Sequence, residues 1–186
     1  QYTLHIRDLR TGVDMPDTAE RVGSLAWAAD SRTLFYSTED ETTKRQDRIF
    51  RHTLGAPLAD DALVLHEQDE RFNIGVGRTR DGRYLMIEAG SHTTNEYRFL
   101  NATEPTGEFT LIAPRIDDQE YYPDHRWSKD TGDRFYIRVD DTGKNFRVVT
   151  APTATPGREH WTELIALDPI HPLEDFDLFQ SFAVTT

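Results

Sequence analysis

The chain contains no cysteine, so it has neither a disulfide framework nor a thiolate that could act as a nucleophile or metal ligand. No apolar run approaches the roughly 20 residues that a membrane-spanning helix needs. Basic residues are also scarce: 21 Lys and Arg against 33 Asp and Glu give a formal net charge of −12. This balance argues against nucleic acid and against anionic membrane surfaces as partners, because few side chains would neutralise phosphates.

Hydrophobic residues make up 37% of the chain, charged residues 29% and aromatic residues 11%. This composition suits several thin sheets better than one thick core, and no helical periodicity is sustained. The chain starts at Gln1 rather than Met and alternates at once through Tyr2, Leu4 and Ile6. We therefore expect a piece of a longer chain, and the absence of a signal-peptide pattern leads us to expect a cytoplasmic location.

A repeat of about fifty residues organises the chain. Each period contains four strand-like segments separated by turn residues such as Asp30-Ser31, Asp81-Gly82 and Gly132-Asp133. The segments of the three periods are, in chain order, residues 24–28, 32–36, 47–52 and 62–66, then 73–77, 83–87, 95–100 and 109–113, then 122–127, 134–137, 144–149 and 161–166. Four short strands per period are typical of a propeller blade.

The predicted fold is all-β, a fragment of a β-propeller with four-stranded antiparallel blades. Within this partial propeller domain, residues 1–186, we expect three whole blades at about 23–68, 72–115 and 121–167. Half-blades are expected at 1–22 and 173–186. The two half-blades are complementary in strand count, so they could pair by closing a small ring or in a swapped dimer. The alternative is a β-sandwich with accidental spacing.

Several segments resemble the propeller of oligopeptidase B, a branch of the prolyl oligopeptidase family. They lie at residues 24–36 (SLAWAADSRTLFY), 51–55 (RHTLG), 69–76 (DERFNIGV), 90–97 (GSHTTNEY), 144–147 (KNFR), 158–165 (REHWTELI) and 173–176 (LEDF). The resemblance implies a parent enzyme in which a seven-bladed propeller caps an α/β-hydrolase domain that cleaves short peptides after Arg or Lys. This chain would then be a non-catalytic segment that screens substrate size and forms part of the cavity wall. Its partners would be the hydrolase domain of the same parent and, as substrates, short basic peptides.

The chain lacks the Gly-x-Ser-x-Gly elbow that a hydrolase nucleophile requires, because Gly23-Ser24 and Gly90-Ser91 have no second glycine. We therefore expect the catalytic triad to lie outside these residues, and we expect no cofactor. One acidic stretch lacks the spacing of a calcium loop and is interpreted as a solvated loop rather than a metal site. It contains Asp117, Asp118, Glu120, Asp124 and His125.

In such a blade, the loop leading into the first strand and the loop between the second and third strands emerge on one face. Both kinds of loop are acidic here, with few basic residues beside them, so we expect an acidic face that attracts peptides bearing Arg or Lys. The alternative is that these loops are charged for solubility. The candidate residues for a cavity wall or for attraction of cationic peptides are Asp69, Glu70, Phe72, Ser91, Asp117, Asp118, Glu120, Glu174 and Asp175. By resemblance this face points toward the peptidase domain. For Phe72 the alternative is packing beneath its loop.

Two other functions remain open at this stage. A free-standing propeller could bind a protein or a carbohydrate, although the signatures of WD40 and Kelch repeats are absent. A small glycosidase could use a pair of the abundant carboxylates. A Gly-x-Ser-x-Gly elbow further along the parent reading frame would favour the peptidase.

Overall fold

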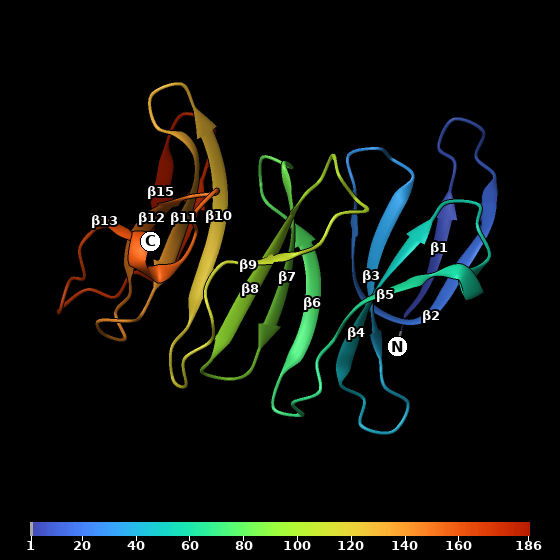
Figure 1. Ribbon diagram of the computed structural model, residues 1–186, viewed down its shortest axis with the longest axis horizontal. Coiled ribbons are helices and arrows are strands. Elements are labelled where there is room, and N and C mark those ends of the chain that lie inside the picture. The colour runs from blue at the N-terminus through green and yellow to red at the C-terminus, as the bar shows by residue number, and fades with distance from the viewer. Residues whose placement is uncertain (1) are drawn as a thin grey trace.

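The structure is a computed structural model and describes residues 2–186, so Gln1, the first residue of the expected half-blade, lies outside the described residues. Antiparallel strands dominate it (Figure 1). Two 3-10 helices occur in the described part of the chain, η1 (Leu58–Asp60) and η2 (Arg158–His160). Within residues 2–186, neither is long or apolar enough to cross a membrane. The all-β prediction is confirmed.

The strands of the described residues form four sheets. The first contains β1 (Tyr2–Arg7), β2 (Asp14–Trp27), β3 (Thr33–Glu39), β4 (Gln46–Thr53) and β5 (Ala62–His66). The second contains β6 (Asn73–Arg78), β7 (Tyr84–Gly90), β8 (Asn95–Asn101) and β9 (Thr110–Leu111). The third contains β10 (Tyr121–Ser128), β11 (Gly132–Val139), β12 (Arg147–Pro152) and β13 (Thr162–Ile165). The fourth is the hairpin of β14 (Phe176–Leu178) and β15 (Ala183–Thr185).

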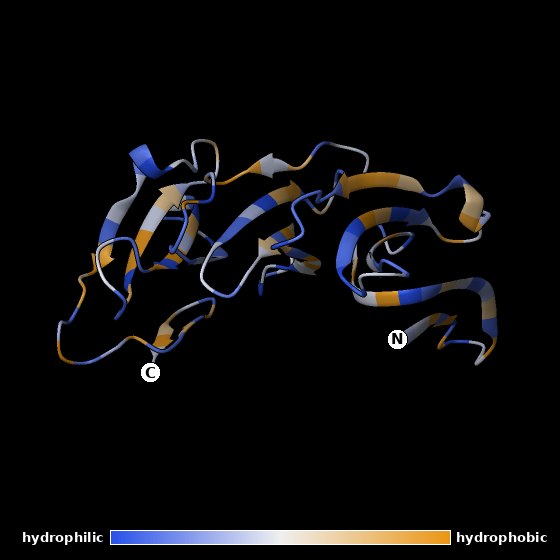
Figure 2. Ribbon diagram, turned by 90° about the horizontal axis from the view of Figure 1, so that it is seen from below, coloured by the Kyte–Doolittle hydropathy of each residue, from blue (hydrophilic) through white to orange (hydrophobic). Residues whose placement is uncertain are grey.

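The sheets stand in a row without closing into a ring. Figure 2 shows this row from below, with both ends of the chain on the same side of it. The three main sheets have the strand order of consecutive blades, each strand pairing with the next one in sequence. The propeller architecture expected from the repeat is therefore confirmed as an open fragment.

The two terminal hairpins do not complete one blade together. Strand β2 crosses the boundary expected between residues 22 and 23, and its Val22 pairs with both Tyr2 of β1 and Thr38 of β3. The N-terminal hairpin is thus joined to the first sheet, whereas β14 and β15 pair separately. The register of β2 shifts just after Val22, where a Cβ on Gly23 would overlap the Gln46 amide. The closed small ring that the strand count allowed is not formed.

The second sheet is buried on both of its faces. Leu85 and Ile87 of β7 pack against Phe35 of the first sheet, whereas Met86 between them packs against the third sheet. Phe135 and Ile137 lie on the third sheet's side of this second cluster. Successive side chains of a strand point to opposite faces, so a continuous apolar run serves two interfaces.

Replacing Ile87 tests this two-sided burial. The side chain is fully buried, so Ile87→Ala should lower the free energy of unfolding by about 2–5 kcal/mol. Leu164→Ala, at a half-exposed position, should change it by less than about 0.5 kcal/mol. Urea unfolding followed by tryptophan fluorescence measures both, and equal losses would contradict the assignment of Ile87 to the interface between sheets.

Candidate functional site

The loops expected on one face do meet there. The β3–β4 loop contacts the loop that leads into β6 through Arg45, and the β11–β12 loop contacts the loop that leads into β10 through Lys144. The backbone N–H of Asp118 also donates to Thr94 Oγ1 in the β7–β8 loop, at 2.8 Å. We call this surface the loop face; it comprises residues 40–45, 67–72, 91–94, 114–120, 140–146 and 168–175. In Figure 1 the β3–β4 and β7–β8 turns, which belong to this loop face, lie along the lower edge of the molecule.

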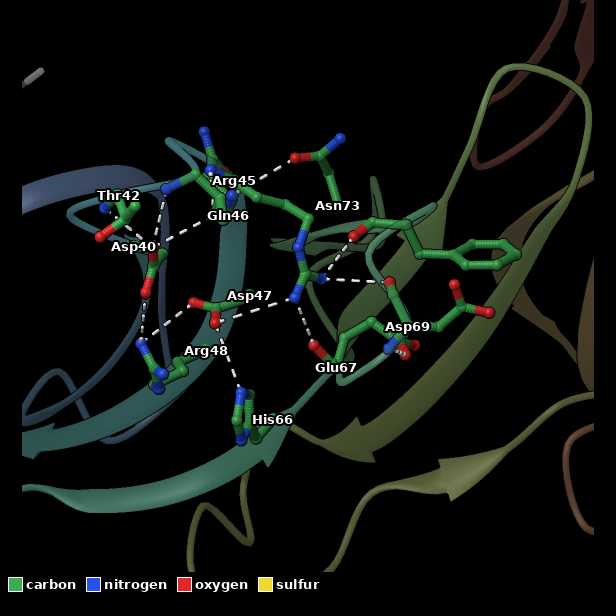
Figure 3. A network of polar contacts seen from close by, with 12 residues as sticks. Asp40, Thr42, Arg45, Gln46, Asp47, Arg48, His66, Glu67, Asp69 and Asn73 are labelled. Atoms are coloured by element: carbon green, nitrogen blue, oxygen red, sulfur yellow. Dashed lines mark hydrogen bonds and ion pairs between the residues drawn. The ribbon is translucent and has the colours of Figure 1, made fainter.

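Arg45 organises the loop that leads into β6 (Figure 3). Its guanidinium donates to three backbone carbonyls of that loop: Nη2 to Glu67 O at 2.9 Å, and Nη1 to Asp69 O at 3.2 Å and Phe72 O at 2.8 Å. The Arg45 side chain is only 12% exposed. A cation that binds three carbonyls of one loop fixes the loop's conformation, because each hydrogen bond is charge-assisted.

The β3–β4 loop that carries Arg45 is itself preformed. Asp40 Oδ1 accepts hydrogen bonds from the backbone N–H groups of Thr42 and Thr43, both at 2.9 Å. These bonds hold the pKa of the Asp40 carboxyl below its usual value, so the carboxylate stays charged and keeps accepting. Lys44 then adopts a left-handed backbone, with φ of 61°. The turn thereby aims the next side chain, Arg45, at the neighbouring loop.

Phe72 does not reach the surface. It is 1% exposed, and the Arg115 guanidinium lies 3.8 Å from the centroid of its ring. Arg115 Nη1 also donates to Glu67 Oε2 at 2.8 Å, which fixes the cation over the ring. In this chain Phe72 therefore packs beneath its loop, and its expected place on a cavity wall is not what the structure has. The polar sequence around it gave no signal that Arg115 would cover it.

The acidic side chains of the loop face are more often paired than expected. Hydrogen bonds from Arg71 lower the pKa of Asp69 to about 2, and Lys144 lies 3.4 Å from Asp118. Glu120 accepts a hydrogen bond from the Tyr122 hydroxyl at 2.7 Å. The expectation of a strongly acidic face overlooked Arg71 and Arg115, which lie next to the acidic segments in sequence but were not counted with them.

The remaining candidates lie apart from one another on the loop face. Ser91 Oγ donates to the Thr94 carbonyl at 3.1 Å and closes the β7–β8 turn. Asp117 is 88% exposed and lies 4.0 Å from Arg71, so two lead-in loops are neighbours there. Glu70, which precedes Arg71 in sequence, is exposed. Glu174 and Asp175 are exposed and belong to the last lead-in loop, whose backbone bonds to Thr186.

The acidic stretch at residues 117–125 does not converge on a metal. Asp124 accepts from the backbone N–H of Arg80 at 3.0 Å, and His125 Nδ1 lies 2.7 Å from Asp81 Oδ2. Burial raises the pKa of Asp124, which is the opposite of what a cation ligand would need. Across residues 2–186, no group of three or more His, Asp or Glu side chains is arranged to hold a metal ion.

Two buried histidines lie at the other end of the strands, away from the loop face. The ring nitrogens of His52 lie 2.7 Å from Asp61 Oδ1 and 2.9 Å from Asp17 Oδ1. His125 bridges the second and third sheets through Asp81. Nothing in the sequence signals a role for His52, because its partner Asp17 is distant in sequence and no motif links them.

Comparisons with known proteins agree with this architecture. The family model described as "Prolyl oligopeptidase, N-terminal beta-propeller domain" matches residues 1–186. Dipeptidyl aminopeptidase BI of Pseudoxanthomonas mexicana is 40% identical over 186 residues, which are 99% of this chain and 25% of that protein. Oligopeptidase B from Trypanosoma brucei, solved in a closed form with covalently bound antipain, superposes with a TM-score of 0.83 at 28% identity. That match covers 97% of this chain and 25% of that one.

The described residues thus define an open segment of a β-propeller with four-stranded blades. The chain belongs to the family of prolyl oligopeptidase N-terminal β-propeller domains. It spans about a quarter of the length of the relatives it matches, among them Protease 2 of Moraxella lacunata at 28% identity over 82% of this chain. The matched relatives are peptidases.

Removing the Arg45 guanidinium tests its hold on the loop. Arg45→Met keeps the length of the side chain but loses all three hydrogen bonds, so amide hydrogens of residues 67–73 should exchange at least about tenfold faster. Arg45→Lys should be intermediate, because an ammonium lacks the forked geometry. Hydrogen exchange followed by mass spectrometry reports this segment directly.

Arg10→Met is the matched control, since Arg10 is largely exposed and makes one weak ion pair at 3.9 Å. Exchange at residues 67–73 in Arg45→Met no faster than in this control would show that Arg45 does not hold the loop.

Proposed function

We propose that this chain is a non-catalytic propeller segment of a serine peptidase of the oligopeptidase B type, which cleaves short peptides after Arg or Lys. In this role the segment forms part of the wall of a substrate cavity and keeps large folded proteins out. The observation that carries the proposal is the match of the whole chain to the propeller family, combined with a sequence that lacks a nucleophile elbow. The catalytic residues then belong to a hydrolase domain elsewhere in the parent protein.

The loop face is the surface we assign to the cavity. Its loops are held by cations that bind backbone carbonyls, which supports a rigid wall rather than a mobile flap. Glu70 and Asp117 are exposed on adjoining loops, and Arg71, which follows Glu70 in sequence, lies 4.0 Å from Asp117. Charges that converge in a recess raise the local concentration of ligands of opposite charge, which suits substrates bearing Arg or Lys.

Neutralising these two exposed acids in the full-length enzyme tests the electrostatic part of the proposal. The double variant Glu70→Gln/Asp117→Asn should lower kcat/KM for a basic peptide roughly two- to thirtyfold at low salt, because each exposed charge contributes about 0.2–1 kcal/mol. The difference should vanish near 1 M salt, where the Debye length is about 3 Å. A peptide with a neutral residue at the cleavage site should be unaffected.

Asp130→Asn serves as the matched control, because Asp130 is exposed in the β10–β11 turn at the other end of the strands. A loss that is equal for basic and neutral peptides, or that persists at high salt, would refute attraction of cationic substrates by this face. The proposed role as a wall and size filter would survive that result.

A further inference from the structure

His52 stands at the junction between the N-terminal hairpin and the first full blade. It lies near the end of β4, and its side chain is 3% exposed. Its Nε2 reaches Asp17 Oδ1 on β2 at 2.9 Å, and its Nδ1 reaches Asp61 Oδ1, just after η1, at 2.7 Å. One imidazole therefore connects a strand of the hairpin to two segments of the blade.

The geometry dictates the protonation state of the ring. An ionised carboxylate offers acceptors alone, so both ring nitrogens must carry a proton for both contacts to be hydrogen bonds. Each carboxylate also receives another donor: the backbone N–H of Gly55 for Asp17, and the Tyr36 hydroxyl, at 2.7 Å, for Asp61. Hydrogen bonds to both carboxylates at once are therefore possible for an imidazolium, which places a positive charge between Asp17 and Asp61.

The groups that face His52 from the surrounding elements are few. Asp17 comes from β2, Tyr36 from β3 and Asp61 from the segment between η1 and β5. Asp60 in η1 is exposed. A cavity of about 410 Å³, lined by Pro16, Gly55 and Pro57 among others, adjoins the ring and gives protons a route to solvent.

We propose that His52, Asp17 and Asp61 form a proton-dependent joint that holds the N-terminal hairpin on the first blade. Loss of one proton from His52 leaves a ring nitrogen lone pair against a carboxylate and two uncompensated negative charges in a buried site. The junction between hairpin and blade then opens, while the sheets farther along the chain keep their packing.

The direction of the pH dependence follows from the two kinds of group. Burial lowers the pKa of His52, but Asp17 and Asp61 outweigh burial and raise it above the usual 6.5. The joint's contribution is therefore fully present below about pH 6.5 and is lost as pH rises through the raised pKa. The pKa of Asp17 is lowered against the effect of its burial, by Gly55 and His52, so acid weakens the joint only below about pH 4.

Hydrogen exchange of the full-length protein between pH 6 and 9 tests the joint, with rates corrected for the intrinsic pH dependence of exchange. The opening equilibrium of residues 2–20 should rise tenfold per pH unit above about 6.5, as release of one proton requires, until pH reaches the pKa of His52. Residues 84–90 of β7 should show no such rise. In His52→Gln the hairpin should be less protected at pH 6 and insensitive to pH.

His171→Gln is the control, because His171 is an exposed histidine paired with Asp168, and it should reproduce the wild-type profile. A flat wild-type profile for residues 2–20 overturns the proposal without recourse to any variant. A His52→Gln protein that keeps the wild-type pH dependence also overturns it. If His52→Gln fails to fold, the wild-type profile decides alone.

Discussion

The fold depends on one constraint: a blade can bury its faces only against its neighbours. The second sheet shows this most clearly, since Leu85 and Ile87 face one neighbour and Met86 faces the other. Strands of this kind appear in the sequence as continuous apolar runs, although buried polar side chains such as Asn95 and His125 also occur within strands. The two ends of the strands differ in chemistry, with acidic loops at one end and buried histidine contacts at the other. Binding by the second sheet therefore falls to its loops, because both of its faces pack against neighbouring sheets.

Some cations at the loop face fix the backbone of a loop, while others pair with carboxylates. Arg45 and Lys144 each bind carbonyl oxygens of a lead-in loop, and Arg138 donates in the same way to the Leu173 carbonyl at 3.2 Å. In each case a cation of one blade holds the loop that leads into that blade or into the next one. The contact is charge-assisted and leaves the carboxylates of the loop pointing outward. Because these cations bind backbone carbonyls, a face with many ion pairs still presents exposed acids such as Glu70 and Asp117. These contacts also tie the shape of the surface to the order of the blades.

The sequence predicted the strands well because their signal is local. Alternation and turn residues placed β6 and β8 within one residue of their observed bounds and β7 within three. The continuation of β2 through residue 22 was not predictable in this way, because Val22 pairs with strands on both sides and the register shift beside it depends on Gln46. The burial of Phe72 was weighed but not settled, since Arg115, which covers its ring, comes from the opposite end of the same expected blade in sequence. The contact from His52 to Asp17 was hidden for a related reason: both residues lie in one sheet, but periodicity specifies which residues form strands, not which side chains of separate strands meet.

We propose that these residues are a scaffold for chemistry carried out elsewhere in the parent protein. The most direct measurement is labelling of the active full-length enzyme with a fluorophosphonate probe, followed by mass spectrometry of its peptides. The expected result is a single modified serine outside this segment, with loss of peptide hydrolysis in proportion to labelling. Modification of a serine within the segment, such as Ser24 or Ser91, in step with loss of activity would contradict the assignment of the segment as non-catalytic.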